Sequence, residues 1–209
     1  MPARLGWIVM ESPAVLLFLW IYVQGSRALE LVPLSLCVLW QVHYVHRTFI
    51  FPFRLRAAGR TMPVVVALMA FSFQLVNAWT NARWLSELGA YPPIAQAPPH
   101  YLVGVALFVL GLGINLHADT VLLRLRAPGE TGYRIPQGGL YRYITCPNYF
   151  GELIEWGGFA LASWSLSGLA FFLFTLANLV PRAVANHRWY REKFADYPPE
   201  RRALVPGVL

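Results

Sequence analysis

The sequence predicts an all-α integral membrane protein, and three observations lead to this fold class. Of the 209 residues, 57% are apolar and only 13% are charged, whereas a soluble domain carries about 25% charged residues. The mean hydropathy is +0.47. The apolar residues also gather in stretches of about 20, the length that a helix needs to cross a ~30 Å hydrocarbon layer. Helices are expected because lipid cannot satisfy open backbone donors and acceptors.

Six stretches are apolar enough to span a membrane, although some contain polar interruptions. We expect these spans at 5–24, 30–51, 62–84, 101–123, 147–164 and 166–188. No cleavable signal peptide is expected, because the first stretch contains Glu11 and Pro13 and no small-residue cleavage site follows it. Cys37 and Cys146 lie in or beside apolar stretches and are expected to be unpaired core thiols. Without internal repeats or low-complexity linkers, residues 1–209 are expected to form one membrane-embedded domain.

The basic residues predict the orientation of the chain in the membrane. The formal charge is +7, but no nucleic-acid partner is expected, because the arginines lie between apolar stretches, where they act as topology signals. Basic residues favour the cytoplasmic side. Both termini and the loop 124–146 are therefore expected there, and residues 85–100, with four prolines, are expected outside and extended. The basic residues on the cytoplasmic side would include Arg4, Arg54, Arg56, Arg60, Arg124, Arg126, Arg134 and Arg142.

Polar side chains inside the apolar stretches are the candidate functional residues, because burying them costs several kcal/mol unless they are matched. Glu11 lies in the first stretch and Gln41 in the second. The others lie toward the expected cytosolic ends of the spans and predict a pocket that opens to the cytosol. They are His43, Tyr44, His46, Arg47, Asn115, His117, Asp119, Asn148, Glu152, Glu155, Arg182, Asn186, His187 and Arg188.

Several of these residues also have a purely structural interpretation. Tyr44 could be an interfacial anchor. Asn115 and Asp119 share a helix face at i, i+4 spacing and could cap a helix end, although aspartate is unfavourable at a C-terminus. Asn148, after a helix start at Pro147, could be an N-cap or a ligand-binding amide. Glu155 could be a partner of the helix dipole in the first turns.

Three other chemistries lack the motifs that they need. Five histidines and two cysteines are too few for a histidine-rich di-iron site or a structural zinc site, so no metal is expected. A serine hydrolase has no G-x-S-x-G motif here. Gly111 and Gly113 lack the third glycine of a dinucleotide-binding loop, and we expect them to allow close helix packing instead.

Five motifs follow one another in the chain, and in this order they resemble the steroid 5α-reductase family, the 3-oxo-5α-steroid 4-dehydrogenases. They are 43–49 (HYVHRTF), 111–119 (GLGINLHAD), 128–140 (PGETGYRIPQGGL), 148–156 (NYFGELIEW) and 196–198 (DYP). The resemblance covers about residue 8 to the C-terminus. It implies about six transmembrane helices, equivalent to the later spans of a seven-helix member, and a bacterial homologue. It also implies a monomer in the bacterial inner membrane or a membrane of the endoplasmic-reticulum type.

The activity that the resemblance implies is NADPH-dependent reduction of the 4,5 double bond of a 3-oxo-Δ4-steroid. Hydride addition to the β-carbon of an enone places negative charge on the distant carbonyl oxygen, so donors to that oxygen stabilise the transition state. The family pattern assigns this role to Tyr44 and Glu11. The family often has Gln-Glu where this chain has Met10-Glu11. This chain therefore has the acid but has methionine in place of the glutamine amide.

The resemblance also implies a set of residues that contact NADPH. Arginine suits phosphates, whereas carboxylate and amide groups suit ribose hydroxyls and the nicotinamide. Arg47 is a further candidate for a phosphate, and residues 124–146 would be the cofactor-binding loop. The contacts implied by resemblance are Asn115, Asp119, Arg126, Tyr133, Arg134, Asn148, Glu152, Asn186 and Tyr190.

Three alternatives stay open at this point. The first is a related membrane reductase that acts on another lipid enone, a polyprenol or an enoyl thioester. The second is a membrane methyltransferase, against which the run Tyr133–Gly139 (YRIPQGG) counts. The third is a non-catalytic protein that binds or transports sterols within membrane lipid, a function that would leave Glu11 without a task.

Overall fold

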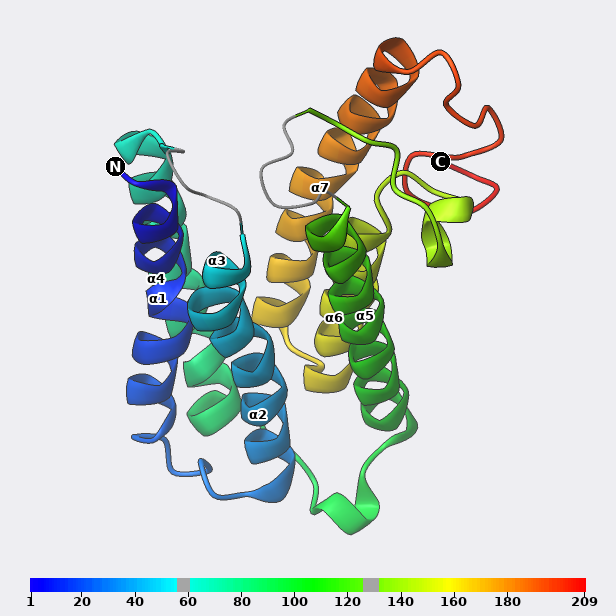
Figure 1. Ribbon diagram of the computed structural model, residues 1–209. Helices are drawn as coiled ribbons and strands as arrows, with labels where there is room; N and C mark the ends of the chain where they lie inside the picture. Colours follow the sequence, from blue (N-terminus) through cyan, green and yellow to red (C-terminus); the bar gives the residue numbers. More distant parts are fainter. Residues whose placement is uncertain (56–60, 126–131) are drawn as a thin grey trace. The chain divides into compact units, whose positions relative to one another are not determined.

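The computed structural model describes residues 1–55, 61–125 and 132–209. In this part of the chain six helices have 15 or more residues, and they follow the six predicted stretches in order (Figure 1). The prediction of an all-α protein is confirmed, because the described residues otherwise form short helical segments, loops and two isolated β-bridges. The long helices are α1 (Ala3–Tyr22), α2 (Leu31–Val45), α4 (Val64–Arg83), α5 (Pro99–Arg124), α6 (Pro147–Ser163) and α7 (Leu166–Lys193).

Short segments continue two of these helices. The π-helix η1 (His46–Ile50) and the helix α3 (Phe51–Arg54) follow α2, and the π-helix η2 (Trp84–Leu88) follows α4. Pro52 has no N–H to donate to the preceding turn, which accounts for a change of helix type immediately before α3. Two 3₁₀ turns, η3 (Ile94–Gln96) and η4 (Gly139–Arg142), lie in the longer connections.

Four of the long helices are long and apolar enough to cross a membrane. Within the described residues, these candidate spans are Ala3–Tyr22, Val64–Leu88, Pro99–Arg124 and Leu166–Lys193. With 15 and 17 residues, α2 and α6 are shorter than the candidate spans. The expectation of six spans is therefore confirmed for four helices, and the protein is a multi-pass membrane protein.

The chain divides into two compact units. The first unit contains Met1–Leu102 and Ala160–Gly168. In it α1 packs along α4 and beside α2 (Figure 1). Aromatic rings join α1 to α2: Phe18 stacks on Trp40 with ring centroids 4.7 Å apart, and the Trp40 indole donates a hydrogen bond to the Ala14 carbonyl at 2.8 Å. Trp40 also contacts Tyr44, with centroids 4.9 Å apart.

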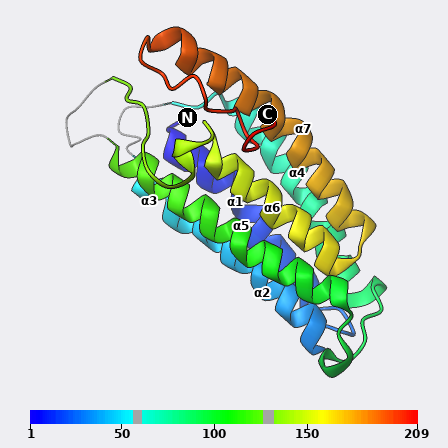
Figure 2. The ribbon, with the colours of Figure 1, turned by 90° about the vertical axis from the view of Figure 1, so that its right-hand side faces the viewer.

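The second unit contains Val103–Phe159 and Leu169–Leu209, and α5, α6 and α7 lie side by side in it (Figures 1 and 2). Glycine allows α5 to approach α6 closely. A Cβ atom on Gly111 would lie 2.3 Å from the Glu155 nitrogen, and one on Gly151 would lie 2.6 Å from the Asn115 nitrogen. The predicted close packing is confirmed at Gly111. At Gly113 it is wrong, because two residues turn the helix by about 200° and this glycine faces open space.

Residues 85–100 are extended only in part, which corrects the expectation for this segment. Helical structure runs on through η2 to Leu88, and η3 interrupts the rest. The proline-based expectation fails because proline also suits the first position of a helix, where its missing N–H costs nothing. Pro93 directly precedes η3 and Pro99 begins α5.

Candidate functional site

The two predicted catalytic residues meet at one side chain in the first unit. Gln74 on α4 places its side-chain nitrogen 2.8 Å from Glu11 Oε2 and 3.3 Å from the Tyr44 hydroxyl. Glu11 comes from α1 and Tyr44 from α2. Tyr44 and Gln74 are buried, and Glu11 is half-buried. Three helices thus bring a carboxyl, a phenol and an amide together inside an apolar bundle, where hydrogen bonds act in a low dielectric.

Gln74 is a residue that the sequence interpretation missed. The available signal was a row of amides in the third apolar stretch, where Gln74, Asn77 and Asn81 follow i, i+3 and i+7 spacing on one helix face. Their contacts continue along α4, because Asn77 donates to Gln74 Oε1 at 3.1 Å and Asn81 donates to Asn77 Oδ1 at 3.0 Å. An amide therefore does contact Glu11, although position 10 holds methionine.

Arg47 also lies in the first unit, in the π-helical segment η1. Its guanidinium stands 5.0 Å from the ring centre of Trp7 and 4.9 Å from that of Phe51. The Trp7 indole donates a hydrogen bond to the Arg47 carbonyl at 3.0 Å. Stacking between two rings orients a guanidinium while leaving its edge able to bond oxygen atoms.

Three of the predicted cofactor residues form a polar cluster in the second unit. Asn115 donates to the Asn148 carbonyl at 3.0 Å, and the Asn148 side chain donates to Asp119 Oδ1 at 3.2 Å. Asn115 and Asp119 are buried on the same face of α5, as their spacing predicted. The N-cap interpretation of Asn148 is wrong, because α6 begins at Pro147 and Asn148 lies inside its first turn.

Glu152 and Glu155 follow Asn148 along α6. Glu152 is half-buried, whereas Glu155 is fully buried. The interpretation of Glu155 as a first-turn partner of the helix dipole is wrong, because this residue lies in the third turn after Pro147 and the dipole effect fades beyond the first.

The remaining predicted cofactor residues in the described chain border α7 or lie on it. Tyr133 and Arg134 are exposed, and the Tyr133 ring packs edge-on against Trp189 with centroids 4.7 Å apart. Tyr190 stacks on Tyr197 at 5.6 Å. Asn186 is exposed and donates a hydrogen bond to Cys146 Sγ at 3.7 Å. Arg126 lies outside the described residues, as do Arg56 and Arg60.

Arg201 holds part of the 128–140 motif to the C-terminal segment, a role that the sequence interpretation missed. The side chain is only 3% exposed. Its guanidinium donates to the Pro136 carbonyl at 3.0 Å and to Gln137 Oε1 at 2.8 Å, and it lies over the Tyr197 ring. No local pattern marks this arginine in the sequence, because its partners lie 65 and 64 residues away.

The segment before α6 is fastened to the same C-terminal residues. The Thr145 backbone N–H donates a hydrogen bond to the Arg202 carbonyl at 2.8 Å. The Thr145 hydroxyl lies 2.6 Å from His187 Nδ1 and 2.7 Å from the Tyr197 hydroxyl. Cys146, which is free and buried as predicted, packs in a small core with Ala183, Ala203 and Leu204.

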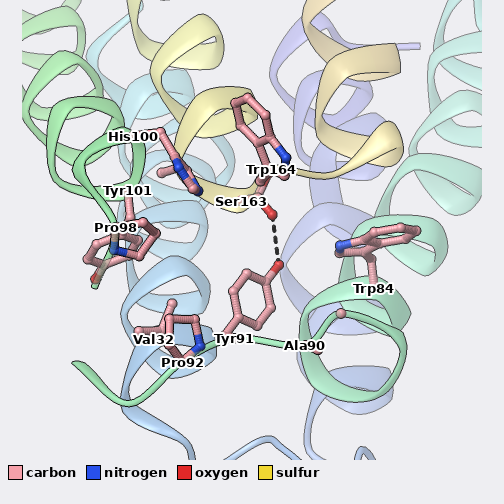
Figure 3. Close-up of a pocket in the computed structure, with 12 residues that line it drawn as sticks. Val32, Trp84, Ala90, Tyr91, Pro92, Pro98, His100, Tyr101, Ser163 and Trp164 are labelled. Atoms are coloured by element: carbon pink, nitrogen blue, oxygen red, sulfur yellow. Dashed lines mark hydrogen bonds between the residues drawn. The ribbon is translucent and has the colours of Figure 1, made fainter. Parts of the chain in front are cut away.

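A separate cavity of about 190 Å³ lies in the first unit and holds none of the predicted site residues (Figure 3). The Tyr91 hydroxyl points toward the turn between α6 and α7 and donates to the Ser163 carbonyl at 3.0 Å. Burial raises the pKa of Tyr91 above its usual range, so the phenol stays a donor. Several aromatic rings line it, from Trp84, Tyr91, His100, Tyr101 and Trp164.

Comparison with known proteins identifies the family. A family model described as 3-oxo-5-alpha-steroid 4-dehydrogenase matches residues 60–209. Along its whole length the chain is 45% identical to 3-oxo-5-alpha-steroid 4-dehydrogenase 1 of Rattus norvegicus and 43% identical to that of Homo sapiens, and it covers 81% of each. It is also 42% identical to steroid 5-alpha-reductase DET2 of Gossypium hirsutum, over 98% of this chain and 81% of that protein.

The chain belongs to the 3-oxo-5-alpha-steroid 4-dehydrogenase family. This confirms the resemblance that the motifs indicated, and it makes the protein an oxidoreductase of that family. Four of the five motifs lie inside the matched region 60–209. The motif at 43–49, which contains Tyr44, lies before that region and within the stretch shared with the full-length relatives.

Proposed function

We propose that this 3-oxo-5-alpha-steroid 4-dehydrogenase family member reduces the 4,5 double bond of 3-oxo-Δ4-steroids to 5α-steroids with NADPH. The observation that carries the proposal is the convergence of Glu11 and Tyr44 on one buried amide, 2.8 and 3.3 Å away. A phenol and a carboxyl placed together in an apolar site suit a substrate with one polar oxygen on a large apolar body. The whole-length identity to two 3-oxo-5-alpha-steroid 4-dehydrogenases supports the same substrate class.

In this mechanism Tyr44 and Glu11 donate hydrogen bonds to the 3-oxo oxygen of the substrate. Bound NADPH supplies the hydride that adds to the β-carbon of the enone. The electron pair of the 4,5 double bond moves toward the carbonyl, and negative charge develops on its oxygen. Donors aimed at that oxygen stabilise the transition state more than the ground state. Protonation of the α-carbon then completes the reduction.

The polar residues of the second unit suit the cofactor. Asp119, Asn148 and Asn115 present carboxylate and amide groups for hydroxyl and amide partners, and exposed Arg134 presents a guanidinium for phosphate. Glu152, Asn186, Tyr190, Tyr133 and Arg47 complete the proposed contacts within the described chain. Arg126, outside the described residues, is proposed as a further phosphate ligand.

The proposed topology places both termini and residues 124–146 in the cytoplasm, with α2 and α6 also crossing the membrane. The basic residues that flank the spans support it through the positive-inside bias. The protein would then act as a monomeric membrane domain that draws NADPH from the cytosol, in a bacterial inner membrane or one of the endoplasmic-reticulum type.

The test is to incubate purified protein with NADPH and a panel of Δ4-3-ketosteroids and to follow products by mass. A product that gains two hydrogens, with one NADPH oxidised for each, is expected. NADPH deuterated at the transferred hydrogen should place deuterium on the β-carbon. Reduction of a polyprenol or enoyl thioester but of no steroid would replace the substrate assignment. Binding of a steroid without turnover would contradict the proposed enzymatic function and favour a non-catalytic sterol-binding protein. Equal efficiency with NADH would contradict the cofactor assignment.

A further inference from the structure

We infer that Gln74 is a positioning residue of the catalytic pair, because its amide donates one hydrogen bond to Glu11 and one to Tyr44 and thereby directs the hydrogens of both toward the substrate. The inference rests on the proposed function, in which these two residues donate to the substrate oxygen. It adds a residue that orients the Glu11 carboxyl and the Tyr44 hydroxyl so that both remain hydrogen-bond donors.

A backbone carbonyl on α4 fixes which end of each side-chain amide is oxygen and which is nitrogen in the row Gln74, Asn77 and Asn81. Asn81 contacts the Asn77 carbonyl oxygen at 3.0 Å with the same side-chain atom that lies 3.0 Å from Asn77 Oδ1. A backbone carbonyl can only accept, so this atom must be the NH₂ nitrogen of Asn81. The Asn77 oxygen is then the acceptor, and the Asn77 NH₂ group faces Gln74 Oε1 at 3.1 Å.

The same logic fixes the orientation of Gln74. Its oxygen accepts from Asn77, so its NH₂ group faces the catalytic pair. The two hydrogens of that group match the two acceptors, Glu11 Oε2 at 2.8 Å and the Tyr44 hydroxyl at 3.3 Å. Gln74, Asn77 and Asn81 are 6%, 5% and 1% exposed. In such surroundings a reversed Gln74 amide would set its NH₂ group against the Asn77 NH₂ group without water to relieve it.

An amide in this orientation controls where the hydrogens of the pair point. The Tyr44 oxygen accepts from Gln74, so its own hydrogen is donated to an acceptor other than Gln74. Because Glu11 Oε2 also accepts from Gln74, the hydrogen of a protonated Glu11 carboxyl resides on Oε1. Both groups thus stay able to donate to the developing enolate oxygen. Gln74 is therefore expected to affect kcat, with little influence on cofactor affinity.

A purely structural role makes a different forecast. Interhelical hydrogen bonds between polar side chains also hold membrane helices together, and Gln74 joins α4 to α1 and α2. If it does no more than this, Gln74→Leu should lower the thermal stability and leave kcat per folded molecule unchanged. The test needs readouts that separate the two roles.

The first measurement compares Gln74→Leu with Gln41→Leu in the full chain. Gln41 is a matched control: it is a half-buried glutamine of the same unit, and its amide contacts the Val15 carbonyl at 3.5 Å. We expect Gln74→Leu to lower kcat about tenfold or more, less than the ~10²–10³ for loss of a direct donor. The KM for NADPH should stay within about twofold, and Gln41→Leu should leave both values unchanged. Asn77→Leu, which lets the Gln74 amide turn, should lower kcat by a smaller factor.

A double-mutant cycle asks whether Gln74 acts through the pair. In a Tyr44→Phe background one of its two acceptors is gone, so the fold-loss caused by Gln74→Leu should shrink at least threefold. An equal fold-loss in both backgrounds, or an unchanged kcat in Gln74→Leu, would overturn the inference. A wild-type protein that reduces no steroid would instead refute the proposed function.

Infrared spectroscopy tests the contact between Gln74 and Glu11 without requiring catalytic turnover. The carboxyl band of Glu11 can be identified by its loss in Glu11→Gln. It should shift in Gln74→Leu and Asn77→Leu and stay in place in Gln41→Leu. A band that does not move in Gln74→Leu would overturn the inference whatever the activity of the protein.

Discussion

The two units hold their polar residues in different ways. In the first unit the site residues lie on long helices, and their side chains contact one another directly, as Gln74 does with Glu11 and Tyr44. In the second unit Asn115, Asp119 and Asn148 also contact one another from two helices, but another part of the motifs lies in a non-helical segment that a distant side chain holds, as Arg201 holds Pro136 and Gln137. A rigid helical frame suits groups that must be aimed at a reacting atom, whereas connecting segments suit a large cofactor with many contacts. Changes at Glu11, Tyr44 and Gln74 in the first unit should therefore lower kcat, and changes at the motif residues of the second unit should raise the KM for NADPH.

The largest expected effect is on kcat, from the catalytic pair. Tyr44→Phe and Glu11→Ala should each lower kcat about a hundredfold or more, because each removes a proposed donor to the enolate oxygen. Glu11→Gln should be milder, since an amide still donates, and the KM for NADPH should change little in all three. A kcat for Tyr44→Phe within about threefold of wild type would remove Tyr44 from this role, because a lost hydrogen bond of ~1 kcal/mol already corresponds to about fivefold.

The next effect should come from the long-range contact of Arg201. Arg201→Ala leaves the buried Pro136 carbonyl without its donor, at a cost of about 1–3 kcal/mol, and it also removes the hydrogen bond to the exposed Gln137 side chain. The KM for NADPH should rise about thirtyfold, with kcat at saturating NADPH within about threefold. Arg201→Lys should raise the KM for NADPH by less than Arg201→Ala does, because an ammonium group cannot form both of the hydrogen bonds that the planar guanidinium forms. Exposed Arg202 provides the control, and equal effects of Arg201→Ala and Arg202→Ala would contradict this account.

A smaller effect is expected within the polar cluster. Asn148→Ala removes the donor to Asp119 Oδ1 at 3.2 Å and an amide proposed to face NADPH. One lost hydrogen bond to a charged group is worth about 1.5 kcal/mol, which corresponds to roughly tenfold in the KM for NADPH. Cofactor titrations and steady-state rates would check this. A fall in kcat without a change in KM would place Asn148 with the reacting atoms and erase the distinction between the units.

The smallest expected effect concerns Cys146. Burial raises the pKa of the Cys146 thiol to about 11, against which the hydrogen bond from Asn186 acts only weakly. The thiolate is the reactive form, so alkylation at pH 8 should be slow and should quicken as the pH rises toward 11. Since the folded pKa lies above the ordinary value, the stability from the neutral buried thiol is present below about pH 9 and is lost as the pH rises through 11.

Asn186→Ala should slow that alkylation less than about threefold, measured by mass spectrometry in a Cys37→Ala background, because a bond to sulfur at 3.7 Å is weak. If Asn186 also contacts NADPH, the same variant should raise the cofactor KM. An unchanged KM would limit Asn186 to its contact with the thiol.

The sequence by itself determined the helices and the family. Runs of about 20 apolar residues act locally, since hydropathy and backbone hydrogen bonding extend over only a few turns, so all six long helices lie where the runs predicted. Pro147 marked the start of α6 for the same local reason. The motifs at 111–119 and 148–156 pointed to the family because residue types at fixed spacings can be recognised from the sequence alone. The proposal that Tyr44 and Glu11 are catalytic was made in this way.

Only the tertiary structure decided which side chains meet. The amide that contacts Glu11 comes from Gln74, 63 residues away in another helix, and no residue spacing in the sequence predicts such a contact. Arg201 reaches Pro136 across 65 residues, and whether it faces the motif or solvent depends on how the tail folds back. Gly111 and Gly113 look alike in sequence, yet only Gly111 meets a neighbouring backbone. Local rules choose the conformation of each segment, whereas the contacts between segments depend on the rotation and register with which helices pack.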